Sequence, residues 1–460
     1  MEQYEGRRVL IVGLARSGVC AAKMLCELGA SVTVNDMKTA EQLGEETMQA
    51  LSALPCRQAL GVAPDDLLGD TEVLVLSPGI AYAKPFVQEA VRRGIEVIGE
   101  LELGARVLRG RLVAITGTNG KTTTTTLTGE IFRATGKHTL VCGNIGYPIT
   151  AEALTMGDDA VTVAEVSSYQ CETVSRFHPD VAACLNITED HLVRHGDMQT
   201  YIAMKHRIFE NQTRHDAAVF NYDDPACREM ARDLKAHIVW FSRKEKVDCG
   251  AYVDGEMVMF RMDRPVAVCR VNEIRIPGPH NLENALAAVA ITGALGVSPE
   301  IMREVLMTFP GVEHRIETVR TLDGVTFIND SKGTNVDSTQ KAIATMTRPT
   351  VLILGGSDKK VSFVPLAETI AAAPQIIHCV LIGDTAEQIR TALEAADIHR
   401  YTMAGYDFDH ALAIAREQAP DGGCVLLSPA CASFDMFKDF EDRGRIFKDK
   451  VNAMTSAREE

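Results

Sequence analysis

Aromatic side chains and long apolar runs are scarce in this sequence of 460 residues. Aromatic residues make up 5% of the chain, with a single tryptophan, which leaves little material for stacking nucleic-acid bases. No run of about 18 apolar residues occurs, so a membrane-spanning helix is not expected. The first residues lack the apolar stretch and the cleavage site of a secretory signal peptide, and we therefore expect a cytoplasmic protein.

Basic residues are fewer than acidic ones, and no two cysteines have the spacing of a metal-binding pair. Lys and Arg number 47 against 62 Asp and Glu, which gives a net charge of −15 at pH 7. A general nucleic-acid or membrane-surface binder would carry the opposite sign, so neither partner is expected. The 12 cysteines form no CxxC pair, which argues against a zinc site and predicts reduced thiols.

Short β-rich segments alternate with helical stretches along most of the chain, a pattern typical of parallel sheets covered by helices. The expected strands are Val9–Val12, Ser31–Asn35, Val73–Leu76, Ile95–Ile98, Leu112–Thr116, Ala160–Val166, Val181–Ile187, Ala217–Asn221, His237–Phe241, Val325–Asn329, Thr350–Leu354, Cys379–Ile382 and Cys424–Ser428. Asp254-Gly255 lies between two β-rich runs, which predicts a hairpin in a small antiparallel annex, followed by an Ala-rich helix over 282–295.

Chain length and this pattern predict an α/β protein of three domains, each with a mainly parallel sheet and flanking helices. We expect a Rossmann-like domain over 1–108, a P-loop ATPase-like domain with the annex over 109–312, and a second Rossmann-like domain over 313–460.

The strongest local signal is Gly-Thr-Asn-Gly-Lys-Thr at 117–122, between an expected strand and an expected helix. Glycines let successive backbone N–H groups point inward, and the following helix N-terminus adds partial positive charge. Lys121 can reach the β- and γ-phosphates, and the Thr122 hydroxyl can bind Mg²⁺. Ile115 stands where the general pattern has glycine, so the segment is a variant phosphate-binding loop.

A weaker glycine cluster, Gly13 to Gly18, follows the first expected strand, and Asp36 ends the second at the usual offset of a ribose ligand. Ala15 stands where a dinucleotide fingerprint needs glycine, so a nucleotide-sugar site is favoured over NAD, and a tight turn that binds nothing is the alternative. Ser77-Pro78-Gly79 would form the opposite wall of the same crevice.

Polar residues also gather at two strand ends of the central region. Glu165 ends one strand, and Asn186-Ile-Thr-Glu-Asp-His191 leaves the next. Because parallel strands present their carboxyl ends at one edge, a carboxylate there beside a phosphate loop is a natural Mg²⁺ ligand. Lys205 lies on a helical stretch over 198–209, and from its residue type alone it would be solvent-exposed.

Several motifs in order resemble the Mur ligase family. They are Gly-Thr-Asn-Gly-Lys-Thr at 117–122, Glu-Val-Ser-Ser at 165–168, Asn-Ile-Thr-Glu-Asp-His at 186–191, His-Asn-Leu-Glu-Asn at 280–284, Glu-His-Arg-Ile-Glu at 313–317, Asn-Asp-Ser-Lys-Gly-Thr-Asn at 329–335 and Leu-Gly-Gly-Ser-Asp-Lys at 354–359. The run from Leu427 to Gly444 is similar to the branch that adds D-glutamate. The resemblance covers nearly the whole chain. It implies a monomeric enzyme of peptidoglycan synthesis that couples D-glutamate to UDP-N-acetylmuramoyl-L-alanine through an acyl phosphate, with ATP and two Mg²⁺ ions.

The resemblance also implies site residues. ATP would contact Gly117, Thr118, Asn119, Gly120, Lys121, Thr122, Thr123, Asn281, Asn284, His314, Arg315 and Asp330. The UDP-sugar would contact Leu14, Ala15, Ser17, Asp36, Ser77, Gly79, Asn144 and Ser167. D-Glutamate would contact Thr334, Lys359 (or its neighbour Lys360), Ser433 and Phe440. Metal would be held by Thr122, Glu165, His191 and a carbamylated Lys205, and catalysis would use Lys121, Glu165, His191 and Lys205.

The residues leave two other interpretations open and argue against a third. Another Mur ligase or a folylpolyglutamate-type ligase would share the central motifs but take a different amino acid. A nucleotide-dependent switch would need only the phosphate loop. An NAD-dependent oxidoreductase would use the Gly13 cluster, which Ala15 disfavours.

Overall fold

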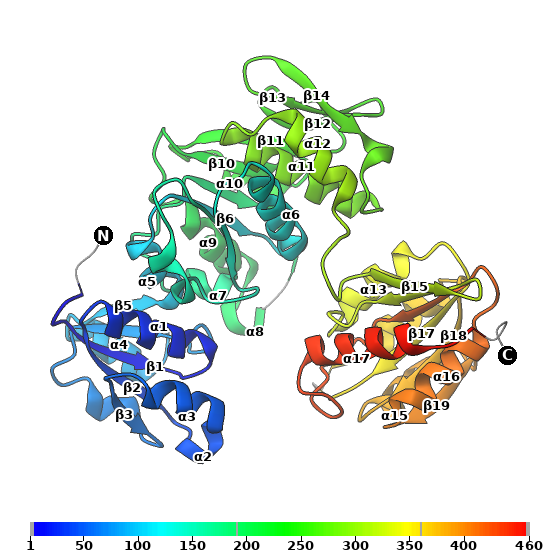
Figure 1. Cartoon of the computed structure of the whole chain (residues 1–460), viewed down its shortest axis with the longest axis horizontal. Coiled ribbons are helices and arrows are strands. Elements are labelled where there is room, and N and C mark those ends of the chain that lie inside the picture. Colours follow the sequence, from blue (N-terminus) through cyan, green and yellow to red (C-terminus); the bar gives the residue numbers. More distant parts are fainter. Residues whose placement is uncertain (1–3, 190–191, 359–360, 457–460) are drawn as a thin grey trace. The chain divides into compact units, whose positions relative to one another are not determined.

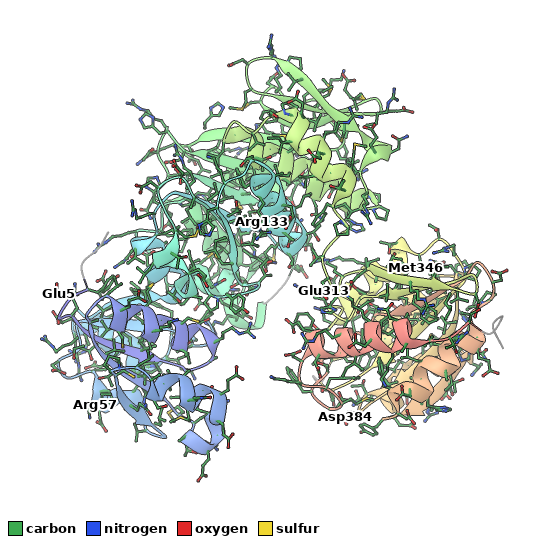
Figure 2. The ribbon with its side chains drawn as sticks, viewed as in Figure 1. Glu5, Arg57, Arg133, Glu313, Met346 and Asp384 are labelled. Carbon is green, nitrogen blue, oxygen red and sulfur yellow. The ribbon has the colours of Figure 1, made fainter. Side chains whose placement is uncertain are left out.

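The computed structural model describes residues 4–189, 192–358 and 361–456. The chain divides after Phe309 into two compact units, called unit 1 and unit 2 (Figure 1). Each unit is built of α/β layers with charged side chains on its surface, where Arg57, Arg133 and Asp384 are exposed (Figure 2). Within the described residues, none of the helices combines the length and the apolar character needed to cross a lipid bilayer.

The first unit opens with a five-stranded parallel sheet of strand order β3-β2-β1-β4-β5. Its strands are β1 (Arg8–Val12), β2 (Ser31–Asp36), β3 (Arg57–Leu60), β4 (Val73–Leu76) and β5 (Glu96–Gly99). Its helices are α1 (Arg16–Glu27), α2 (Ala40–Leu43), α3 (Glu45–Ser52), η1 (Pro64–Leu67) and α4 (Pro85–Arg92). Successive side chains of a strand face opposite sides, so Ile11 packs into one buried cluster and Leu10 into another. Burial on both faces is expected for a parallel sheet with helices on its two sides, which the sequence predicts.

The same unit continues with a nine-stranded sheet of order β14-β13-β12-β11-β10-β9-β6-β8-β7. Its strands are β6 (Arg111–Thr116), β7 (Thr139–Gly143), β8 (Val161–Glu165), β9 (Val181–Cys184), β10 (Ala217–Asn221), β11 (His237–Ser242), β12 (Gly250–Asp254), β13 (Met257–Arg261) and β14 (Pro265–Arg270). The predicted hairpin is β12–β13, but β12 pairs in parallel with β11. The antiparallel strands therefore extend the central sheet and do not form a sheet of their own.

Helices cover this sheet, and the Ala-rich one is buried along most of its length. They are α5 (Glu100–Val107), α6 (Lys121–Ala134), η2 (Ile149–Ala151), η3 (Ala153–Thr155), α7 (Ser168–Cys171), α8 (Leu192–His195), α9 (Met198–His206), η4 (Arg207–Phe209), α10 (Pro225–Met230), η5 (Val271–Glu273), α11 (Pro279–Ala294) and α12 (Pro299–Thr308). Residues 284–293 of α11 are all buried. Small side chains allow this close packing, and Pro279 suits the first helical position because its missing N–H has no partner there.

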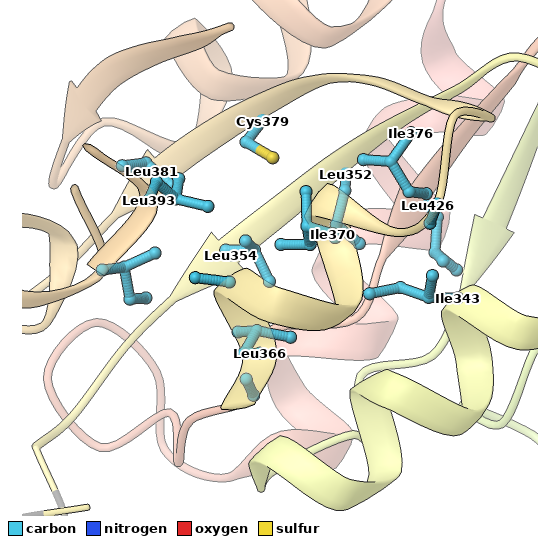
Figure 3. Packing of buried hydrophobic residues seen from close by; sticks show 14 of the residues in the cluster. Ile343, Leu352, Leu354, Leu366, Ile370, Ile376, Cys379, Leu381, Leu393 and Leu426 are labelled. Atoms are coloured by element: carbon cyan, nitrogen blue, oxygen red, sulfur yellow. The ribbon is translucent and has the colours of Figure 1, made fainter. Parts of the chain in front are cut away.

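The second unit holds a six-stranded sheet of order β15-β16-β20-β17-β18-β19, parallel except for β15. Its strands are β15 (Glu317–Leu322), β16 (Val325–Asn329), β17 (Thr350–Gly355), β18 (Ile376–Ile382), β19 (Tyr401–Gly405) and β20 (Cys424–Leu427). Its helices are α13 (Val336–Thr345), α14 (Val364–Ala371), α15 (Ala386–Ala395), α16 (Phe408–Gln418) and α17 (Phe440–Ala453). Leu352 and Leu354 of the central strand β17 pack against Ile370 of α14 (Figure 3).

All the predicted strands are present, and the α/β fold class is confirmed. The strands that the sequence pattern did not predict are β3, β7, β14, β15 and β19.

Candidate active site

The loop between β6 and α6 requires glycine at two positions. Gly117 has a φ of 144° and Gly120 a φ of 83°. A Cβ on Gly120 would lie 2.2 Å from Oδ1 of Asn284, and one on Gly117 would lie 3.0 Å from Cβ of Leu185. Helix α6 begins at Lys121, directly after the loop, so its first amides face the loop region. The backbone thus has the form of the predicted phosphate-binding loop.

Asn186 fastens this loop to the end of β9. Its Oδ1 accepts from the Asn119 amide at 2.8 Å, and its Nδ2 donates to the Asn119 carbonyl at 3.0 Å. Its own carbonyl accepts from the Thr118 amide at 2.9 Å. The sequence motif contains this asparagine, but its function as a loop clamp was not predicted, because a side-chain amide alone does not reveal its backbone partners.

Lys121 lies across the loop. Its Nζ donates to the carbonyl oxygens of Gly117 at 3.0 Å and Thr118 at 2.9 Å. Thr122 and Thr123 follow in the first turn of α6 and are buried. An ammonium held at this point can bind a phosphate oxygen in place of a carbonyl, as the loop motif requires.

Glu165 is a buried carboxylate with one unsatisfied oxygen. It ends β8 and is 2% exposed. Its Oε1 accepts from Nδ2 of Asn144 at 2.8 Å, whereas its Oε2 has no hydrogen-bond partner among the described residues. A buried carboxylate oxygen without a partner is costly unless a cation binds it. Glu165 therefore fits a Mg²⁺ ion, as expected from its strand-end position.

Lys205 is buried, contrary to what its residue type alone suggests. It is 1% exposed, and its Nζ donates to the Gly117 carbonyl at 2.8 Å. The same Nζ lies 4.6 Å from the centre of the Tyr201 ring, and the Tyr201 hydroxyl is 3.1 Å from Oγ1 of Thr118. Lys205 and Tyr201 thus both contact the phosphate loop. Sequence reasoning missed Tyr201, although its position four residues before Lys205 places both on one face of α9.

Three residues that the sequence analysis names for the site, His191, Lys359 and Lys360, lie outside the described residues. In the described part of the chain, no group of three or more His, Cys, Asp or Glu side chains gathers as a metal site. The remaining predicted metal ligands are Thr122, Glu165 and Lys205.

A pocket of about 510 Å³ adjoins the clamped loop at the side of α11. Its lining includes Asn186, Asp223, Lys244 and Glu283, and of these only Asn186 and Glu283 belong to motifs that the sequence singled out. Asn284, next to Glu283, accepts from Oγ1 of Thr124 of α6 at 3.3 Å and donates to Asn281 at 3.2 Å. Both predicted asparagines therefore lie near the start of α6.

Six of the eight predicted nucleotide-sugar residues lie at the carboxyl edge of β1, β2 and β4. The carboxylate of Asp36 accepts from the Leu14 amide at 2.8 Å and the Lys38 amide at 2.9 Å. The Ser77 hydroxyl donates to the Gly13 carbonyl at 2.7 Å. These bonds fix the turn that leads into α1, in which Ala15 is the N-cap and Ser17 lies in the first turn, while Gly79 lies in the loop after β4.

The central sheet carries two predicted sugar-site residues, Asn144 and Ser167. Asn144 donates to Glu165, and Ser167 caps a short helix. Its Oγ accepts from the Gln170 amide at 3.3 Å, and its own amide donates to the Gln170 side chain at 3.0 Å. This capping box begins two residues after Glu165 and starts α7.

In the second unit, the predicted His314 and Asp330 lie close to the end of β16. The Asp330 carboxylate accepts from Oγ of Ser428 at 2.6 Å and from the Ile316 amide at 3.2 Å. Burial raises its pKa to about 7, against the lowering effect of Ser428 and the nearby Arg315. His314 has a φ of 62° and is buried, which lowers its pKa.

Two of the predicted D-glutamate residues, Ser433 and Phe440, are held in place by a network around one buried arginine. Sequence analysis did not single out this arginine. Arg443 is fully buried and donates to the Cys431 carbonyl at 3.2 Å and to the Ser331 carbonyl at 2.8 Å. These bonds hold the chain before Ser433, itself 2% exposed. The Ser331 hydroxyl donates to the Phe440 carbonyl at 2.8 Å, so one network fixes both positions. Thr334 lies in the segment that leads into α13.

Family models match most of the chain. The Mur ligase MurD-like N-terminal domain matches residues 7–99, the Mur ligase middle domain residues 115–292, and the Mur ligase glutamate ligase domain residues 314–431.

Similar proteins span the same length. The UDP-N-acetylmuramoylalanine--D-glutamate ligase of Alkaliphilus metalliredigens is 43% identical over 456 residues, which are 98% of this chain and 99% of that protein. The protein of the same name from Clostridioides difficile is 43% identical over 452 residues, 97% of this chain and 99% of its own.

Solved structures of low identity share the fold. The UDP-N-acetylmuramate-alanine ligase of Thermotoga maritima matches with a TM-score of 0.61 at 17% identity, covering 97% of this chain and 99% of its own. MurF from Acinetobacter baumannii matches with a TM-score of 0.61 at 19% identity, covering 98% of this chain and 95% of its own. The family models and full-length relatives together establish that the chain belongs to the Mur ligase family.

Proposed function

We propose that this chain couples D-glutamate to UDP-N-acetylmuramoyl-L-alanine, with cleavage of ATP to ADP and phosphate. The single observation that carries the chemistry is the meeting of three features at one sheet edge. They are the clamped phosphate loop, the unsatisfied Glu165 oxygen and the buried Lys205. The choice of D-glutamate rests on the relatives of that name at 43% identity over nearly the full length.

Two Mg²⁺ ions would be held by Thr122, Glu165, Lys205 and His191, the last of which lies outside the described residues. The Oε2 of Glu165 offers a buried carboxylate oxygen that suits a hard cation. When bound, the ions would neutralise charge on the transferring phosphoryl group.

Lys205 would serve as a carbamate. Its amine is buried beside the phosphate loop, where a lysine has little access to bulk water. After the ammonium loses a proton, the neutral amine would bond to the carbon of CO₂ and release a second proton to solvent. The resulting carbamate anion offers carboxylate oxygens, as Glu165 does, to a Mg²⁺ ion. Tyr201, whose ring lies against the amine, would orient the modified side chain.

The reaction would begin with attack of the terminal carboxylate of UDP-N-acetylmuramoyl-L-alanine on the γ-phosphorus of ATP. Lys121 would leave its loop carbonyls and stabilise the charge that develops on the phosphoryl oxygens. The bond to ADP breaks and an acyl phosphate forms. The neutral amine of D-glutamate then attacks the acyl carbon, phosphate leaves, and an amide results; His191 would help to remove the amine proton.

Substrate binding would be divided among three domains over 1–108, 109–312 and 313–460. The UDP-sugar would be bound by Leu14, Ala15, Ser17, Asp36, Ser77 and Gly79 at the edge of the first sheet, with Asn144 and Ser167. The 510 Å³ pocket beside Asn284 would take the adenine side of ATP, with Asn281 close by. Further ATP contacts are proposed for His314, Arg315 and Asp330 of the third domain. The matched family segments fall inside these bounds.

D-Glutamate would be bound by Ser433, Phe440, Thr334 and Lys359. A dicarboxylate needs a cation and hydroxyl donors, which these residue types provide. Arg443 would keep the Ser433 turn in place from behind, because its guanidinium is engaged by backbone carbonyls. We further propose that the enzyme acts as a monomer in the cytoplasm.

The test is phosphate release from ATP with Mg²⁺ and UDP-N-acetylmuramoyl-L-alanine, across a panel of D- and L-amino acids, with the product identified by mass. Release that depends on D-glutamate and yields the coupled product is expected. Lys121→Met should abolish it, whereas Lys137→Met, at an exposed lysine just beyond α6, should not. Release with a different acceptor would overturn the D-glutamate assignment, and release without any acceptor would favour a nucleotide-dependent switch.

A further inference from the structure

A largely buried ion pair lies between the loop that follows β4 and the helices α7 and α8. Arg194 of α8 binds Glu172 through two parallel contacts, Nε to Oε1 at 2.8 Å and Nη2 to Oε2 at 2.8 Å. The two side chains are 20% and 12% exposed. The guanidinium carbon also lies 4.8 Å from the centre of the Tyr169 ring. Bidentate geometry with stacking is an arrangement that arginine supports and lysine does not.

Both partners of this pair also hold the loop that follows β4. Nη2 of Arg194 donates to the Ile80 carbonyl at 3.3 Å, and Oε2 of Glu172 accepts from the Tyr82 amide at 3.3 Å. The Ile80 amide in turn donates to the Ser77 carbonyl at 2.9 Å. The pair therefore fixes two points of the segment 77–82, which carries the proposed sugar-nucleotide contacts Ser77 and Gly79.

The other side of the pair is anchored in the central sheet. Glu172 directly follows α7, and only Val166 and Ser167 separate the first residue of α7 from Glu165. Arg207 donates to the Glu172 carbonyl at 2.7 Å and to the Cys171 carbonyl at 2.9 Å. A continuous set of contacts thus runs from the loop after β4 to the strand end that carries Glu165.

We infer that Arg194 is a positioning residue, which together with Glu172 holds the loop 77–82 in the conformation that binds the nucleotide-sugar substrate. The inference rests on the proposed function. The loop contains Pro78 and Gly79 and is not part of a strand or helix, so its order depends on contacts of this kind. Loss of the pair would leave the loop free to sample other conformations, and substrate binding would then have to order it.

The test compares Arg194→Met, Glu172→Gln and the double variant with the wild type. The KM for UDP-N-acetylmuramoyl-L-alanine should rise about tenfold in each single variant, while the KM for D-glutamate, bound by unit 2, stays unchanged. The rise in KM of the double variant should be smaller than the product of the two single rises, because both single variants break the same ion pair. Arg194→Lys should also show a raised KM for UDP-N-acetylmuramoyl-L-alanine, because an ammonium cannot make both contacts to Glu172 and reach Ile80.

Arg109→Met is the matched control. It breaks the exposed Arg109–Asp158 pair, whose side chains are 52% and 76% exposed, and should leave both KM values unchanged. Thermal unfolding of every variant separates loss of folding from loss of positioning, and Glu172→Gln keeps the inference testable when Arg194→Met does not fold. An unchanged KM for the nucleotide-sugar, or an equal rise in both KM values, would overturn the inference. A wild type without turnover on these substrates would instead overturn the proposed function, and the inference with it.

Discussion

Oδ1 of Asn284 occupies the space that any side chain on Gly120 would need. A Cβ on Gly120 would lie 2.2 Å from that oxygen, and the φ of 83° is itself unfavourable for other residues. Helix α11 and the phosphate loop, which are far apart in the sequence, therefore fit together only when the loop residue is glycine.

Gly120→Ala should therefore displace Asn284 or the loop and weaken ATP binding. We expect at least a roughly tenfold rise in the KM for ATP in the steady-state assay. Gly136→Ala is the matched control, because Gly136 has a φ of 81° but nothing within 4 Å of its Cβ position. The control should lose about 1 kcal/mol of unfolding free energy and keep its KM for ATP. Equal kinetic effects in the two variants would mean that backbone strain, not the contact with Asn284, is responsible.

Glu165→Gln should reduce turnover while leaving the fold intact. The amide oxygen of the glutamine can still accept from Asn144. The substitution removes the negative charge and the unpartnered Oε2 that a Mg²⁺ ion would use. We expect kcat to fall by a factor on the order of a hundred and the Mg²⁺ concentration for half-maximal rate to rise. The thermal midpoint should not fall, because the unsatisfied oxygen contributes nothing to stability. Normal activity at low Mg²⁺ would contradict the assignment of Glu165 as a metal ligand.

The strands that sequence patterns did not predict share one property. β3, β7, β14, β15 and β19 all lie at sheet edges. An edge strand is covered less completely than a central one, so its residues need not be uniformly apolar; β3, for instance, begins with two exposed residues. Central strands such as β17, buried throughout, carry the continuous apolar runs that sequence analysis detects.

The candidate site was predictable where a motif demands a backbone shape, and less so where it depends on contacts between distant residues. The glycines at 117 and 120 and the strand-end Glu165 follow from local rules. The loop clamp of Asn186, the Tyr201 ring against Lys205 and the buried Arg443 depend on which segments the fold brings together. Lys205 is the clearest example of a residue whose position depends on such contacts. Only the resemblance to the Mur ligase family identified it as a site residue, because its residue type alone suggests an exposed side chain.

Lys205→Ala should abolish turnover and regain part of it when small carboxylic acids are added. The substitution leaves space beside the Gly117 carbonyl, and a short carboxylate there would replace the carbamate group. We expect acetate or formate to restore a measurable rate that saturates with concentration. Lys121→Ala, which removes a cation, should show no such rescue. Intact mass under CO₂ provides a second measurement, and absence of both the adduct and the rescue would contradict carbamylation.

Glu100 makes the free energy of unfolding depend on pH, and one substitution should remove this contribution. Burial raises its pKa from 4.5 to about 7, although the Thr150 amide and hydroxyl donate to Oε1 at 2.8 and 2.7 Å. Between pH 4.5 and 7 the unfolded chain loses this proton while the folded chain keeps it, so the free energy of unfolding falls as pH rises through this window. Above pH 7 the fall in the free energy of unfolding is complete and amounts to a value on the order of 3 kcal/mol for this group.

Glu100→Gln should therefore stabilise the protein at about pH 8 and have little effect near pH 4.5. The amide keeps the acceptor for Thr150 and carries no charge to bury. Thermal or urea unfolding at both pH values measures the difference between variant and wild type, in which other titrating groups cancel. Glu256→Gln, at a carboxylate 80% exposed, is the control and should shift stability by less than about 1 kcal/mol at either pH. If Glu100→Gln shifts stability equally at the two pH values, ionisation of Glu100 is not the cause.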